Sequence, residues 1–123
     1  MSAPFVYYFL HNSHTDIGYT DYQEKVEMYH IYYIKEAVDI LNAAHSSRPE
    51  WLGFKWNCES FWCVEKFFQW ADDRYREDFI KYVGSGEIGL SGSYLNLNEI
   101  VDKGTLFETM AENRRADAER CPD

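Results

Sequence analysis

The alternation of short apolar runs with longer helical repeats constrains this chain most. Six segments follow one another as expected strand, helix, strand, helix, strand and helix: 5–10, 24–44, 52–56, 60–83, 87–90 and 105–119. The first is a continuous apolar and aromatic run, which favours a buried strand, whereas the long segments repeat apolar residues at helical spacing. This alternation predicts an α/β fold, in which parallel β-strands alternate with helices that cover the sheet.

Stop signals mark the ends of the expected helices. Pro49 follows the first helix and cannot continue it, and Gly84 stands where a left-handed C-cap would end the second. Asp72 and Asp73 can cap a new helix, which allows a break within 60–83. Three strands leave exposed sheet edges, so we expect residues 1–123 to be a single domain or a fragment of a larger one, with homo-oligomerisation through those edges as one outcome.

Composition and charge exclude several classes of protein. The 123 residues are 46% hydrophobic and 27% charged, which is a globular balance. Lys and Arg number 12 against 21 Asp and Glu, and the net charge of −9 argues against a nucleic-acid partner. No run approaches the ~20 apolar residues of a spanning helix, and the first residues lack the basic region of a signal peptide. We therefore expect no membrane partner.

The cysteines indicate a reducing compartment. Cys58, Cys63 and Cys121 are odd in number and include no C-x-x-C pair, so free thiols are the simpler interpretation. This predicts a cytoplasmic protein. Cys58 also lacks a basic neighbour that would lower its pKa, which argues against a catalytic thiol.

The loop after the first expected strand carries the chemistry most worth testing. His14 and Asp16 are two residues apart, so their side chains point the same way in extended backbone. An imidazole nitrogen and a carboxylate oxygen on one side suit Zn²⁺ or another divalent cation. The alternative from spacing alone is an ordinary polar loop. His11 is a third ligand only if the chain turns, while His30 and His45 fall on or near the first helix and suit surface or core roles.

Two further motifs have simpler explanations. Residues 84–89 match G-x-G-x-x-G, but a helix precedes them and a strand follows, which is the reverse of a dinucleotide-binding loop. We interpret these glycines as a helix stop and turn. Glu59 follows the second expected strand, and without a partner carboxylate we favour a role at the helix N-terminus over acid or base catalysis.

Residues 14–19 resemble the H-x-D-x-G-W opening of glycoside hydrolase family 38, the retaining α-mannosidases. Residues 54–68 resemble the family's second strand and aromatic-rich helix, and 86–99 resemble the glycine-rich segment that follows. The resemblance implies that His14 and Asp16 bind Zn²⁺, which holds hydroxyls of the mannose. It also implies that Tyr19, in place of the usual Trp, lies under that sugar, and that this chain is the first part of a seven-stranded β/α barrel.

The family's nucleophile motif, of the type D-x-F-G-H, does not occur in this sequence. A retaining glycosidase needs two carboxyl groups ~5–5.5 Å apart. The resemblance therefore implies the N-terminal part of a metal-dependent α-mannosidase that hydrolyses α-mannosidic bonds, inactive as this fragment. One alternative is a non-enzymatic binding or assembly module. Another is a metal-dependent polysaccharide deacetylase, which would want more His and Asp ligands than this chain has.

Overall fold

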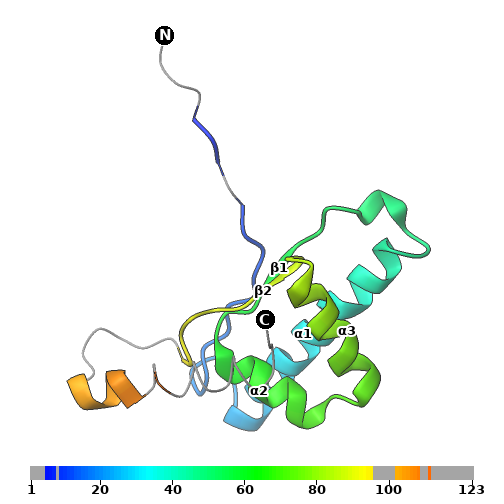
Figure 1. Cartoon of the computed structure of the whole chain (residues 1–123). Coiled ribbons are helices and arrows are strands. Elements are labelled where there is room, and N and C mark those ends of the chain that lie inside the picture. Colours follow the sequence, from blue (N-terminus) through cyan, green and yellow to red (C-terminus); the bar gives the residue numbers. More distant parts are fainter. Residues whose placement is uncertain (1–4, 8, 96–101, 109–110, 112–123) are drawn as a thin grey trace.

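Helices carry most of the described structure. The computed structural model describes residues 5–7, 9–95, 102–108 and 111, of which 55% are helical and 6% lie in strands or bridges. The elements are α1 (Gln23–Ala44), the 3-10 helix η1 (Pro49–Trp51), β1 (Trp56–Asn57), α2 (Phe61–Trp70), α3 (Asp73–Gly84) and β2 (Ile88–Gly89). The expectation of a sheet-based α/β fold that begins a seven-stranded barrel is therefore wrong: the named elements include only two short strands (Figure 1).

The two strands pair in parallel, as expected, but they are short. Trp56 lies opposite Ile88 and Asn57 opposite Gly89. A Cβ on Gly89 would lie 2.5 Å from the side-chain oxygen of Asn57, so glycine allows the two strands to approach this closely. The helix stop and turn expected at residues 84–89 leads from α3 into β2.

The described part of the expected first strand, residues 5–7, 9 and 10, forms no strand. Its described residues have no regular structure, and they extend away from the helices in Figure 1. Phe5 is 87% exposed and Phe9 is 86% exposed. Apolar and aromatic residues favour a strand only where a neighbouring strand supplies hydrogen bonds and a face to bury. Along most of its length, the described part of this segment has no neighbouring strand to hydrogen-bond and no face to bury its side chains against.

The core forms where α1 packs against α2 and α3. The buried stripe of α1 has the periodicity expected from the sequence: Val26, His30, Ile31, Ile34, Ala37, Val38, Leu41 and Ala44. Aromatic side chains fill the other side, where the ring of Phe79 lies 5.4 Å from that of Phe67. Each large apolar side chain buried in this way stabilises the fold by roughly 1.5–3 kcal/mol.

Most helix boundaries follow the signals in the sequence, but the left-handed C-cap expected at Gly84 is wrong: Gly84 is the last residue of α3 and has no positive φ, whereas Gly86 after it has a φ of 72°. α1 ends at Ala44, and Pro49 opens η1 after it. The break expected near Asp72 is confirmed, because Asp72 is the N-cap of α3 and its side chain accepts a 3.0 Å hydrogen bond from the amide of Tyr75. Residues 103–108 are helical and begin the last expected helix, of which 109–110 and 112–119 lie outside the described residues.

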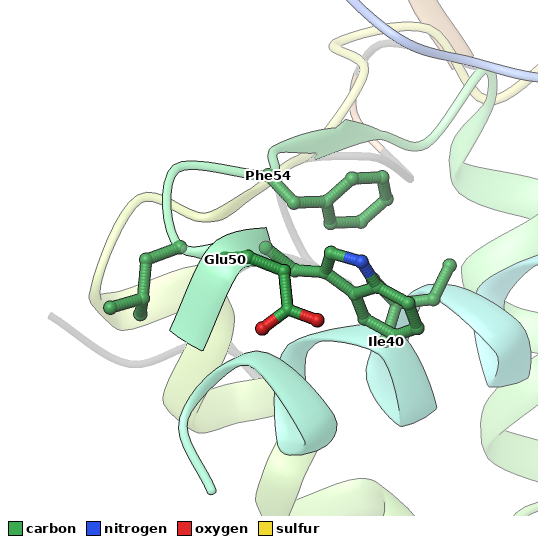
Figure 2. A pocket seen from close by; sticks show the side chains of 5 residues that line it. Ile40, Glu50 and Phe54 are labelled. Atoms are coloured by element: carbon green, nitrogen blue, oxygen red, sulfur yellow. The ribbon is translucent and has the colours of Figure 1, made fainter. Parts of the chain in front are cut away.

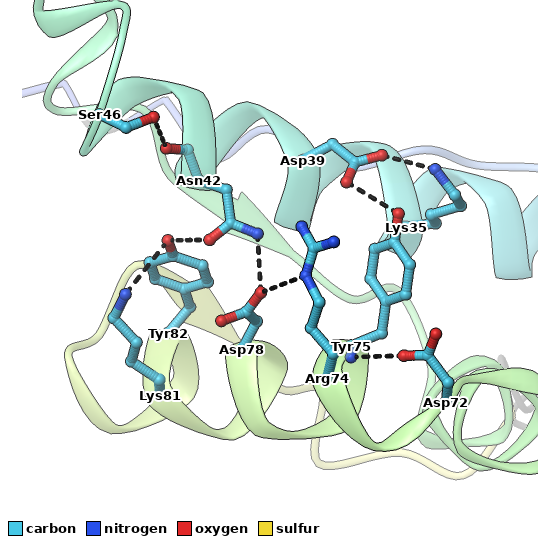
Figure 3. Close-up of polar contacts among 10 residues, drawn as sticks. All are labelled: Lys35, Asp39, Asn42, Ser46, Asp72, Arg74, Tyr75, Asp78, Lys81 and Tyr82. Atoms are coloured by element: carbon cyan, nitrogen blue, oxygen red, sulfur yellow. Dashed lines mark hydrogen bonds and ion pairs between the residues drawn. The ribbon is translucent and has the colours of Figure 1, made fainter.

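Polar contacts fix α3 against α1 (Figure 3). Asn42 donates a 2.8 Å hydrogen bond to Asp78 and accepts one of 2.7 Å from the hydroxyl of Tyr82. One turn away, the hydroxyl of Tyr75 donates to Asp39 at 3.0 Å. Tyr82 thus buries its ring and Tyr75 buries part of its ring, while the hydroxyl groups of both find partners on α1. None of the described helices is long and apolar enough to cross a membrane.

Candidate metal site in the His14 loop

A polar loop, residues 11–22, joins the extended N-terminal segment to α1. The carbonyl of His11 accepts a 2.8 Å hydrogen bond from the amide of Asn57, so the loop starts beside β1. The amide of Thr20 bonds back to the carbonyl of Asp16 at 3.3 Å, which closes a turn. Gly18 lies in that turn with a φ of 82°, a value that favours glycine. The glycine of the H-x-D-x-G motif is therefore needed for backbone geometry.

The structure brings His14 and Asp16 together. His14 Nε2 lies 3.3 Å from Asp16 Oδ1, and the two side chains are 62% and 57% exposed. The predicted juxtaposition of these side chains on one side is thus confirmed, although no strand precedes them in the described residues. The contact is local to residues 14–16 and does not require a strand before them.

Glu59 completes the cluster from a distant part of the chain. Its Oε1 is hydrogen-bonded to His14 Nδ1, and its side chain is only 10% exposed. Ser60 is the N-cap of α2 and Glu59 directly precedes it, so Glu59 lies at the helix N-terminus expected from the sequence, while its side chain contacts His14. The available signal was its position just after β1, because loops at the carboxyl ends of strands meet at one edge of a parallel sheet.

The cluster holds the imidazole between two carboxylates. The hydrogen bond with Glu59 raises the pKa of His14 above its ordinary value, and the negative charges of Glu59 and Asp16 raise it further. Burial opposes this shift only weakly, since the ring is largely exposed. A proton and a metal ion would compete for the same imidazole.

A cavity of about 300 Å³ adjoins the cluster. Its lining residues are Thr15, Asp16, Ile17, His30, Glu59, Ser60 and Leu95. His30 is only 5% exposed. Of the surface and core roles considered for it from the sequence, the core role is therefore the correct one. Its Nε2 donates a 3.0 Å hydrogen bond to the carbonyl of Thr15. This bond ties the loop to α1 and places Asp16 at the cavity wall.

The other candidate residues lie elsewhere. The ring of His11 stacks on Phe54 with centroids 6.3 Å apart, so it does not join His14. His45 contacts Glu87 and stacks on Tyr82. Tyr19 is 89% exposed and lines a separate depression with Gly18, Asp21, Tyr22 and Gln23. Its ring is thus available for stacking but does not line the cavity beside Asp16.

The donor types fit a divalent cation only in part. A neutral imidazole nitrogen and a carboxylate oxygen are ordinary Zn²⁺ ligands, and both are accessible. Among the described residues, however, no group of three or more His, Cys, Asp and Glu side chains is arranged to hold a metal ion. His14 and Asp16 therefore offer two ligands and leave further positions for water or substrate oxygens.

Comparison with known proteins does not identify the function of this site. No protein family, curated protein or solved structure matches the chain.

A second cavity and the thiol of Cys63 offer few groups suited to catalysis. A cavity of about 440 Å³ lies between α1 and η1 and is lined by Ile40, Glu50, Trp51, Leu52 and Phe54 (Figure 2). Its walls are mostly apolar, with a single carboxylate. Cys63 is buried, which raises the pKa of its thiol, and Ser60 lies within hydrogen-bond distance of it. Such a thiol is a poor nucleophile at neutral pH.

Proposed function

We propose that this chain supplies the metal-binding and sugar-binding loop of a retaining α-mannosidase. The observation that carries the proposal is the pairing of His14 Nε2 with Asp16 Oδ1 at 3.3 Å, at the edge of a cavity. The H-x-D-x-G sequence supports the same function through its resemblance to glycoside hydrolase family 38. The proposal concerns the loop and its ligands and does not depend on a barrel.

His14 Nε2 and the carboxylate of Asp16 would hold the cation, with Zn²⁺ as the favoured metal. When bound, such an ion supplies Lewis-acid contacts to sugar hydroxyls. Asp16 lines the cavity and would also orient polar groups of a ligand there. Tyr19 presents an exposed ring for stacking against a sugar face. The sequence contains no D-x-F-G-H motif, so the proposal assigns binding and orientation to this chain and no nucleophile.

Zinc titration of the chain tests the proposal. We expect weak Zn²⁺ binding, because two protein ligands leave the ion open to water, and we expect Asp16→Ala and His14→Ala to abolish it. Asp102→Ala is a control, since that carboxylate bonds to Thr105. Binding that survives both loop substitutions would contradict the proposal. We also expect no hydrolysis of an aryl α-mannoside by this chain, with or without Zn²⁺.

The N-terminal segment favours a second candidate function, an assembly module. Five exposed apolar residues lie close together there: Phe5, Val6, Tyr7, Phe9 and Leu10. An extended apolar segment of this kind can add to the sheet edge of a second copy. Sedimentation equilibrium tests this candidate: the chain should self-associate with rising concentration, and Phe9→Asp should shift it to monomer. A monomer at all concentrations would exclude the assembly function.

The proposed location is the cytoplasm. Cys58 and Cys63 are both buried in the core, which suits a reducing compartment. Labelling of the native protein in cells, with detection of the compartment by fractionation, tests this location.

A further inference from the structure

Glu59, His14 and Asp16 form a line that runs from the protein interior to solvent. The side chain of Glu59 is 10% exposed, that of His14 is 62% exposed and that of Asp16 is 57% exposed. Each carboxylate contacts a different nitrogen of the imidazole. The inner carboxylate is therefore the more firmly held of the two, and the outer pair faces solvent.

The backbone on either side of Glu59 is held in place. The amide of Cys58 donates a 2.9 Å hydrogen bond to the carbonyl of Gly89 in β2. On the other side, Ser60 is the N-cap of α2, and Phe61 donates to the carbonyl of Ser93 at 2.9 Å. A strand end and a helix start thus fix the position from which Glu59 reaches His14.

The contact with Glu59 determines which nitrogen of the His14 ring carries a proton. An ionised carboxylate only accepts hydrogen bonds, so the Nδ1 that contacts Glu59 must carry a proton. In the neutral ring the other nitrogen, Nε2, then keeps its lone pair. That lone pair lies on the side of Asp16, where the two ligands would share a cation. A carboxylate behind a metal-binding histidine acts in this way in many metal sites.

We infer that Glu59 is a positioning residue, which fixes the tautomer and ring orientation of His14 so that Nε2 and Asp16 bind one divalent cation. This inference rests on the proposed function for its metal, but the tautomer itself can be measured without any metal. The role differs from that of an acid or base, because Glu59 acts through His14.

The first experiment measures the tautomer of His14 by ¹⁵N NMR of the imidazole nitrogens in the metal-free chain, under alkaline conditions. His14→Ala identifies the signals. We expect the Nδ1–H tautomer in the native protein and a shift toward Nε2–H, the form that an unperturbed histidine side chain prefers, in Glu59→Ala. An unchanged tautomer in that variant, with helical circular dichroism retained, would overturn the inference.

The second experiment compares Zn²⁺ dissociation constants. Glu59→Gln keeps the shape of the side chain but removes its charge, and we expect its affinity to fall about tenfold or more. Glu87→Gln is the matched control, because Glu87 also contacts a histidine, His45, but precedes β2 and so lies at the opposite end of the two strands. Its affinity should equal that of the native chain.

The two experiments separate the inference from the proposed function. A native chain with the Nδ1–H tautomer but no measurable Zn²⁺ binding would contradict the proposed metal site and leave the Glu59 contact established. A chain that binds Zn²⁺ equally well with Glu59→Gln and Glu59→Ala would support the metal site and overturn the positioning role. Loss of affinity in Glu87→Gln as large as in Glu59→Gln would mean that the effect is a general loss of structure, which also counts against the inference.

Discussion

The carbonyl of His11 accepts a hydrogen bond from the amide of Asn57, and this bond makes β1 the middle of three aligned segments. The amides of Trp56 and Cys58 donate to the opposite side, to Glu87 and Gly89. Although the described part of residues 5–10 forms no strand, the segment that follows it is held beside β1 by this bond. The position of the His14 loop depends on it.

Gly18→Ala should loosen the loop. A Cβ there would meet the side chain of Gln23 at an ordinary 3.5 Å, so the cost comes from the positive φ, at about 1–2 kcal/mol. We expect faster hydrogen exchange at the amide of Thr20, which bonds to Asp16 across the turn. Gly84→Ala is the control, because it ends α3 with open space around it and should be neutral or slightly stabilising.

Phe79→Ala should remove a large part of the stability. The ring is fully buried, and it lies 5.4 Å from the ring of Phe67 and 5.5 Å from that of Phe68. We expect a loss of about 3–5 kcal/mol in the free energy of unfolding, measured by guanidinium denaturation. Ile80→Ala, one residue along α3 and 40% exposed, should cost much less. Equal losses would mean that the core does not lie on this side of the helix.

Glu87 should make stability depend on pH under acidic conditions. Partial burial raises the pKa of Glu87, but the hydrogen bonds from Ser85 and His45 outweigh it and hold the pKa below the ordinary 4.5. A lowered folded-state pKa gives stabilisation that is present above pH 4.5 and is lost as the pH falls through the folded value. Guanidinium midpoints for the native chain and Glu87→Gln should therefore differ at neutral pH and converge in acid. A constant difference across that range would refute this linkage.

Cys63 should be protected from thiol reagents in the folded protein. Burial raises the pKa of its thiol, so the reactive thiolate is scarce at neutral pH. We expect slow alkylation of the native chain at this residue and rapid alkylation in guanidinium, followed by peptide mass mapping. Equal rates in both states would show that the start of α2 opens readily.

The helices were predictable because their signals are local. The apolar stripe of α1 lies within one segment, and Asp72 caps α3 through a residue three positions away. The expected strand at 5–10 failed for the opposite reason. Phe5, Tyr7 and Phe9 have strand propensity, but a strand requires a partner, and propensity does not supply one.

The candidate site likewise combines contacts that are local in the sequence with contacts that depend on the tertiary structure. By itself, the sequence determined that His14 and Asp16 lie together, because they are only two residues apart, and that Gly18 allows the turn beyond them. Only the tertiary structure decided that Glu59, 45 residues from His14, reaches the other face of the imidazole. It also placed the ring of Tyr19 outside the cavity that Asp16 lines. Contacts of this range depend on how α1, β1 and α2 pack, and packing is a property of the whole core that no local pattern encodes.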